Sequence, residues 1–241
     1  MRKRNVMPST DSCRTCASRL RSNWRSLSEV ELQRLDRTRR VVRCDTGEAV
    51  FEQGDPSLGI YCVRSGAVAV RKLDAEGNTV TLGLSYPGDL LGQASLVEEG
   101  EHRTSADAVV PSTVCVLDPR AVSDTLVRNP AMARDTLRRT VAELELAQDA
   151  LVRAATLPPR DRFVRLLLDL LQRHGETCAD GSCRLELPLS RRDLASMVGV
   201  RHETLSRIIA RLEADGLVRF SGRRVSVPSY RRLVAAVPRT A

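Results

Sequence analysis

The chain has 241 residues and a formal net charge of +8 at pH 7, a length that favours two domains over one. No apolar run reaches the roughly 18 residues of a membrane span, and no apolar stretch follows the basic residues 1–4, so we expect a cytoplasmic protein without a signal peptide. Aromatic residues make up only 3% of the chain, which argues against binding of single-stranded nucleic acid by base stacking.

The first 25 residues have little periodicity and contain two cysteines at CxxC spacing, Cys13 and Cys16. This spacing occurs in metal sites and redox-active dithiols, and it also arises by chance. We expect nothing else in this segment to fix its position. The chain has seven cysteines, an odd number, and a cytoplasm is reducing, so metal binding or redox chemistry is favoured over a disulfide framework.

Residues 27–35 have the pattern of a short amphipathic helix, with Ser28 as N-cap and Glu31 in the capping-box position. From residue 40 to 117, short alternating apolar runs are separated by glycine and Asx turns, which is typical of a β-sandwich or jelly roll. Cys44 and Cys62 fall within these runs, and we interpret both as small buried hydrophobic residues.

A long helix is predicted from Pro130 to about Ala155, before the helix-ending pair Pro158 and Pro159. Positions along it alternate steps of four and three residues, the a/d spacing of a two-stranded coiled coil. These seam positions are Leu137, Val141, Leu144, Gln148, Leu151 and Ala155. We expect the seam to form a homodimer interface, and packing against the chain's own β-domain is the alternative.

A further helix is predicted over 160–173, strongly apolar on one side, and a polar loop over 175–183. Cys178 and Cys183 lie in that loop, where we expect solvent-exposed thiols without a functional role.

Residues 189–212 carry the pattern of a helix-turn-helix. Ser190 is a good N-cap with Asp193 in the capping-box position, and Gly199 permits the positive φ of a tight turn. The second helix is apolar at helical spacing, at Leu205, Ile208, Ile209 and Leu212.

The opposite face of this second helix presents Glu203, Ser206 and Arg207, which share one side at i, i+3 and i+4. Arg207 can bind guanine O6 and N7, Glu203 can accept from cytosine N4, and Ser206 can bond either way in a major groove. The alternative is a solvated helix with an ion pair between Glu203 and Arg207.

Two alternating runs, 217–220 and 224–227, flank a turn and predict a hairpin of the kind that forms the wing of a winged helix. Residues 188–241 contain 11 arginines and 4 acidic residues, so nearly all of the net charge lies in the last quarter of the chain, as nucleic-acid binding requires. The expected phosphate contacts are Arg191, Arg192, Arg201 and Arg223.

This order of elements resembles the CRP/FNR family of bacterial transcription regulators over essentially the whole chain. The most specific matches are residues 60–66, 87–92 and the E-x-x-S-R pattern of 203–207. The resemblance implies an α+β fold with an N-terminal β-roll (a cyclic-nucleotide-binding-like jelly roll), a long dimerisation helix and a C-terminal winged helix-turn-helix. The corresponding domain limits are 1–25 for the cysteine-containing segment, 26–129 for the β-roll, 130–157 for the dimerisation helix and 158–241 for the DNA-binding domain.

The resemblance further implies a homodimeric regulator, not an enzyme, whose partners are double-stranded DNA and RNA polymerase. The recognition helix of the FNR branch reads TTGAT half-sites arranged as an inverted repeat.

The FNR branch carries an oxygen-labile 4Fe-4S cluster, and Cys13, Cys16 and Cys115 resemble three of its four cysteine ligands. Ser22 stands where the remaining N-terminal cysteine belongs, and a serine oxygen replaces a thiolate poorly on iron. We therefore expect that another group, such as a water, a small thiol or another side chain, completes an exposed and oxygen-reactive cluster site, or that the cluster is labile or absent.

Three alternatives stay open. A cyclic-nucleotide-responsive regulator is suggested by Arg103 and Thr104, which resemble the residues that hold the cyclic phosphate, although Gln93 replaces a ribose-binding glutamate. A regulator without a ligand, with incidental cysteines, is the second alternative. A redox enzyme is the third, and the absence of a βαβ pattern around Cys13 and Cys16 argues against it.

Overall fold

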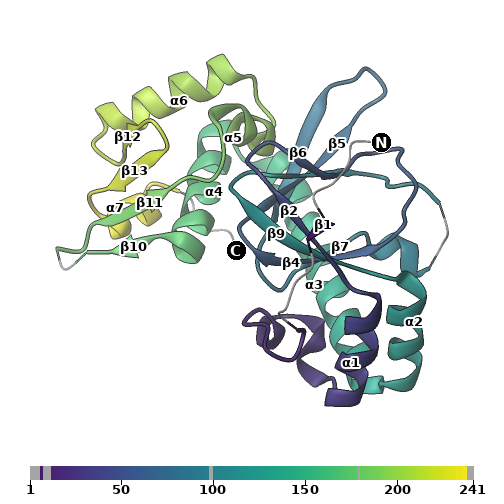
Figure 1. The fold of residues 1–241 in the computed structure, drawn as a ribbon. Helices are drawn as coiled ribbons and strands as arrows, with labels where there is room; N and C mark the ends of the chain where they lie inside the picture. Colours follow the sequence, from purple (N-terminus) through teal and green to yellow (C-terminus); the bar gives the residue numbers. More distant parts are fainter. Residues whose placement is uncertain (1–5, 8–11, 98–99, 179, 238–241) are drawn as a thin grey trace. The chain divides into compact units, whose positions relative to one another are not determined.

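The computed structural model describes residues 6–7, 12–97, 100–178 and 180–237 (Figure 1). The chain forms two compact units, Met1–Leu144 and Glu145–Ala241, which are considered separately below. Within the described ranges, every helix is too short or too polar to cross a lipid bilayer.

The first unit contains a β-roll of two antiparallel sheets. One sheet has the order β1 (Val6–Met7), β2 (Arg40–Cys44), β9 (Ser112–Leu117), β4 (Ile60–Ser65) and β7 (Leu90–Leu91). The other has the order β3 (Ala49–Phe51), β8 (Ser105–Ala108), β5 (Val68–Leu73) and β6 (Thr79–Ser85). The jelly-roll prediction from the alternating runs is thereby confirmed.

Alternation along the strands gives the five-stranded sheet two buried faces. One face packs against the second sheet, and this core includes Cys44, Tyr61 and Phe51. The opposite face packs against the helices, and that core includes Cys62 and Cys115. Cys44 and Cys62 are both buried, as predicted, but they lie in different cores.

Helices cover one end of the roll, where α1 and α2 lie side by side (Figure 1). The helical elements of this part are η1 (Arg19–Arg21), η2 (Asn23–Ser26), α1 (Glu29–Thr38), η3 (Gln93–Leu96), α2 (Pro119–Arg128) and the first part of α3 (Pro130–Thr156). From Glu145 onward, α3 belongs to the second unit. Ser28 and Glu31 form the predicted capping box of α1, with Ser28 N–H donating to Glu31 Oε2 at 2.8 Å. The predicted long helix is also confirmed as α3.

Residues 12–26 are fixed by contacts that the sequence did not reveal, so the expectation that nothing fixes the segment around Cys13 and Cys16 was wrong. Trp24 is buried in the core beneath α1, and Ser18 Oγ donates to the carbonyl oxygen of Arg64 at 2.7 Å. The backbone N–H of Cys13 donates to Asp36 Oδ1 at 2.9 Å. Both CxxC cysteines are therefore held next to the β-roll.

The second unit is a helix-turn-helix with a small sheet of order β10-β11-β13-β12. Its elements are α4 (Pro159–His174), β10 (Glu176–Thr177), β11 (Cys183–Glu186), α5 (Arg191–Val198), α6 (His202–Ala214), β12 (Arg219–Ser221), β13 (Arg224–Val227) and α7 (Tyr230–Ala235). The predicted helix over 160–173 and the predicted wing hairpin are confirmed.

The prediction of a simple polar loop over 175–183 was wrong, because β10 pairs with β11 there. Cys183 begins β11 and pairs with Val227, and like Leu185 it points into the core. Its thiol is therefore buried, against the expectation of exposure, whereas Cys178 is half-buried.

Candidate functional site

The helix-turn-helix begins with a complete capping box. Asp193 N–H donates to Ser190 Oγ at 3.2 Å, and Ser190 N–H donates to Asp193 Oδ2 at 2.9 Å. Gly199 ends α5 at φ 69°, a left-handed conformation that glycine adopts without steric cost. These local bonds set where α5 ends and α6 begins.

The outer face of α6 presents the side chains expected to read DNA. Glu203 and Arg207 are exposed and Ser206 is half-buried, while Leu205 and Ile209 are buried on the other side. Within the part of the chain that the structure describes, the side chains of Glu203 and Arg207 form no ion pair with each other. Their polar groups therefore remain open to a partner molecule.

The wing is joined to the helix-turn-helix through Phe220 of β12. The Arg191 guanidinium lies 5.9 Å from the centroid of the Phe220 ring, a cation–π arrangement. Phe220 N–H also donates to Glu213 Oε1 at 2.7 Å, which links β12 to α6. The arginines expected at DNA phosphates are all exposed: Arg191, Arg192, Arg201 and Arg223.

The seam of α3 is uncovered within one chain. Its six positions, predicted as a dimer interface, are all exposed: Leu137, Val141, Leu144, Gln148, Leu151 and Ala155. Leu151 is 70% exposed, although burial of a leucine side chain is favourable by roughly 1.5–3 kcal/mol. The seam positions that belong to the first unit, Leu137, Val141 and Leu144, are exposed and do not pack on the β-roll of that unit.

Cysteines from the N-terminal segment and from the β-roll lie in one region of the first unit. Cys13 and Cys115 are buried in the same core, and Cys16 is half-buried within electrostatic range of Cys115. Arg39 Nη1 donates to Cys115 Sγ at 3.8 Å. In the described ranges, no group of three histidine, cysteine or acidic side chains is close enough to hold a single metal ion. The expectation of an exposed site was wrong for Cys13 and Cys115, which are buried in one core with Trp24 and Leu35, whereas Cys16 is half-buried.

Burial governs the acidity of these thiols. It is the largest cause of the pKa of Cys62 being raised to about 12, a rise that a side-chain hydrogen bond with Trp24 opposes and that the neighbouring Cys115 and Cys16 support. Burial is also the largest cause of the raised pKa of Cys13 and of Cys115, and for Cys115 the nearby Arg39 opposes it. Without a bound metal these groups are thiols at neutral pH, and a thiol is a weaker nucleophile than a thiolate.

Ser22, at the position of the missing cysteine, has a structural role. Its side chain is fully buried, donates to the carbonyl oxygen of Arg19 at 2.8 Å and accepts from Trp24 N–H at 3.2 Å. The hydroxyl is thereby used as the N-cap of η2.

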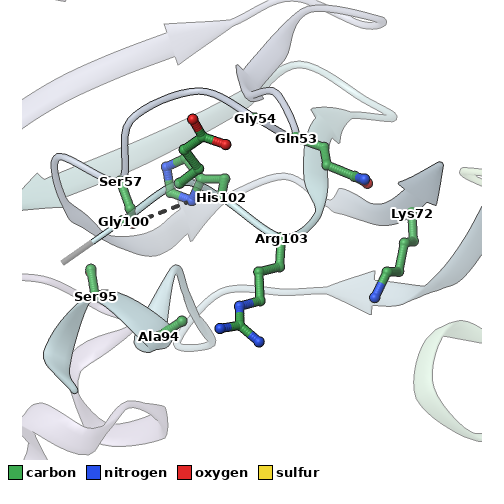
Figure 2. Close-up of a pocket in the computed structure, with 10 residues that line it drawn as sticks. Gln53, Gly54, Ser57, Lys72, Ala94, Ser95, Gly100, His102 and Arg103 are labelled. Atoms are coloured by element: carbon green, nitrogen blue, oxygen red, sulfur yellow. Dashed lines mark hydrogen bonds between the residues drawn. The ribbon is translucent and has the colours of Figure 1, made fainter. Parts of the chain in front are cut away.

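A cavity of about 640 Å³ opens in the β-roll beside Arg103, one of the residues that resemble a cyclic-phosphate site (Figure 2). Its walls include two cationic side chains, Arg103 and Lys72, together with the backbone of Gly54 and Gly100. His102 also lines the cavity, and its ring is stacked on Phe51 with the ring centroids 3.9 Å apart. The other candidate residues of that site, Gln93 and Thr104, are not among the ten residues that line the cavity. Residues 98–99 of the same segment lie outside the described residues.

The sequence interpretation missed the relation between Cys62 and Cys115. The two residues are direct partners in the antiparallel pair of β4 and β9. The sequence shows the strand pattern of each run, but it does not show the register between β4 and β9. Cys62 and Cys115 are 53 residues apart, so no local signal could have revealed that they are neighbours.

Comparisons with known proteins agree with this architecture. Residues 161–236 match the Crp-like helix-turn-helix domain, and residues 41–129 match the cyclic nucleotide-binding domain. The nitrogen fixation regulation protein FixK of Bradyrhizobium diazoefficiens is 29% identical over 88% of this chain and 88% of its own length. The fumarate and nitrate reduction regulatory protein of Salmonella typhimurium is 24% identical over 89% of this chain and 86% of its own length. The solved structure of FixK2 from Bradyrhizobium japonicum superposes with a TM-score of 0.72 at 26% identity, over 83% of this chain and 98% of that one.

Proposed function

Because the chain belongs to the CRP/FNR family of bacterial transcription regulators, we propose that it binds an inverted-repeat operator as a homodimer and responds to oxygen or redox state. It is a DNA-binding transcription regulator and not an enzyme. The observation that carries the proposed response is the grouping of N-terminal and β-roll cysteines in one buried region.

The operator is read by Glu203, Ser206 and Arg207 on the open face of α6. Because the Arg207 guanidinium has no ion-pair partner among the described residues, two of its N–H groups can donate to O6 and N7 of one guanine. Glu203 can accept a hydrogen bond from the cytosine N4 of another base pair. With the E-x-x-S-R pattern, this supports a TTGAT-type half-site. Arg191, Arg192, Arg201 and Arg223 would contact phosphates, which position the protein without selecting sequence.

The α3 seam supplies the dimer. Two copies of a coiled-coil seam bury each other's leucines, and the resulting dimer presents two copies of α6 to half-sites one helical turn apart, about 34 Å. RNA polymerase is the further partner expected from the family.

The effector is a 4Fe-4S cluster held by Cys13, Cys16 and Cys115 together with one more ligand. The donor chemistry fits, since thiolates are the usual ligands of such clusters and Arg39 is placed to offset their negative charge. When bound, the cluster would supply a group that oxygen oxidises.

Anaerobic purification followed by iron and acid-labile sulfide analysis tests this proposal. We expect a brown protein that bleaches in air, and loss of colour in Cys16→Ser and Cys115→Ser. Cys178→Ser is the matched control and should keep its colour, because Cys178 belongs to the second unit. A colourless, iron-free wild-type protein that still binds its operator would contradict the proposed effector.

A second candidate effector is a cyclic nucleotide, and the cavity between Arg103 and Lys72 favours it. Titration calorimetry with cyclic AMP tests this candidate, with Arg103→Ala expected to abolish the heat of binding and exposed Arg43→Ala expected to leave it unchanged. No heat from the wild-type protein at millimolar cyclic AMP would remove this candidate.

A further inference from the structure

We propose that Cys62 provides the fourth thiolate of the cluster site, in the place that Ser22 leaves vacant. This inference rests on the proposed function, because it presupposes a cluster on Cys13, Cys16 and Cys115. It names the one ligand that the sequence left undetermined.

The register of the sheet places Cys62 beside Cys115. They are direct partners across β4 and β9, so both side chains leave the sheet on the same face. The Cβ atoms of such opposed residues are about 4.5–5.5 Å apart. The same row across the sheet continues to Val41 on one side and to Leu90 on the other, and all four side chains belong to the core beneath the helices.

The N-terminal cysteines approach this same face. Cys13 belongs to the same core as Cys62 and Cys115, and the half-buried Cys16 raises the pKa of both β-roll cysteines. Ser18, two residues after Cys16, donates its hydroxyl to the carbonyl oxygen of Arg64, which lies two residues after Cys62 in β4. This bond holds the N-terminal segment against β4 close to both cysteines. Four cysteines of the first unit therefore share one region, while Cys44 lies in the core on the other face of the sheet.

Ser22 does not compete for this role. Its hydroxyl donates to one backbone group and accepts from another, and its side chain has no exposed surface. Moving it onto a metal would break the cap of η2 and leave the Trp24 N–H buried without its acceptor.

Four cysteines in one region match the number of ligands that a polynuclear cluster takes. Among the described residues no three such ligands are close enough to bind the same ion. In an iron–sulfur cluster each cysteine binds a different iron, so the cysteine sulfurs lie further apart than they would around a single metal ion. Arg39 donates to Cys115 Sγ, and Arg39 and Arg64 both lower the pKa of that thiol. The Asp36 carboxylate, which pairs with Arg39 at 2.9 Å, adds one negative charge beside Cys13.

The test compares wild-type protein with Cys62→Ser and Cys44→Ser, all full-length and reconstituted anaerobically with iron and sulfide. Cys44→Ser is the matched control, because it removes a buried thiol from the same sheet on the opposite face. We expect Cys44→Ser to match the wild type in iron content and in lifetime in air. Cys62→Ser should either lose most of its iron or bleach at least about tenfold faster.

Mössbauer spectroscopy of the wild-type protein provides a measurement that does not depend on the folding of a variant. With Cys62 as ligand, all irons have sulfur-only coordination, and no iron shows an oxygen or nitrogen ligand. An oxygen- or nitrogen-ligated iron in the wild type would overturn the assignment of Cys62, as would Cys62→Ser protein with wild-type iron content and lifetime. In both cases the proposed function would stand, whereas iron-free wild-type protein after reconstitution would overturn both.

Discussion

Leu144 on the α3 seam offers a direct test of the dimer, because a second leucine on the same helix provides its control. Leu144 is 57% exposed and Leu146 is 54% exposed, so the two are nearly equal in the single chain. Two residues along a helix correspond to a rotation of about 200°, so Leu146 lies on the side opposite the seam. Only Leu144 should become buried when two helices pair.

The expected effect follows from that exposure. Full burial of a leucine is favourable by roughly 1.5–3 kcal/mol, so burying the remaining half or more contributes about 1–1.5 kcal/mol per helix. A dimer contains the residue twice, so Leu144→Ala should weaken association by about 2–3 kcal/mol, or roughly 30- to 150-fold in Kd.

Sedimentation equilibrium of the three proteins measures this difference. Wild type and Leu146→Ala should be dimers at micromolar concentration, in air as well as without oxygen, and Leu144→Ala should dissociate. Equal dissociation constants for Leu144→Ala and Leu146→Ala would show that the seam is not the interface.

Two further substitutions test the DNA-binding unit. Arg207→Ala should weaken binding to a specific site by roughly 1–3 kcal/mol and relax the preference at one G·C pair. Arg207→Lys should keep the charge but lose the same preference, because lysine cannot donate two coplanar hydrogen bonds to one guanine. Selection from a random DNA pool checks this, and an unchanged consensus in either variant would rule out base reading by Arg207. Ser190→Ala should lower the unfolding free energy of the second unit by about 0.5–2 kcal/mol through loss of the α5 cap, while the exposed Ser221→Ala should have little effect. A chemical denaturation midpoint for Ser190→Ala equal to that of wild type would contradict this role of the cap.

Local features of this chain could be predicted from the sequence because their causes are local. The capping boxes at Ser28 and Ser190 need only a residue pair three positions apart, and Gly199 needs only its own conformational freedom. The alternating runs of the β-roll were recognisable for the same reason.

The features that were missed depend on contacts between distant segments. Cys183 was assigned to a loop because its burial depends on the pairing of β11 with β13, which no nearby residue signals. The anchoring of the N-terminal segment depends on Asp36 and Arg64, and the position of Cys62 depends on its register with Cys115. These long-range contacts decide how the cysteines are arranged, so the candidate effector site could be predicted only in part.

The central claim is that one chain couples a redox-sensitive cysteine site to sequence-specific DNA binding. Fluorescence anisotropy with a duplex containing a TTGAT inverted repeat measures this directly, on one reconstituted preparation before and after exposure to air. We expect the Kd for this duplex to change at least tenfold as the colour is lost, with no such change for Cys115→Ser. An identical Kd before and after complete bleaching would contradict it.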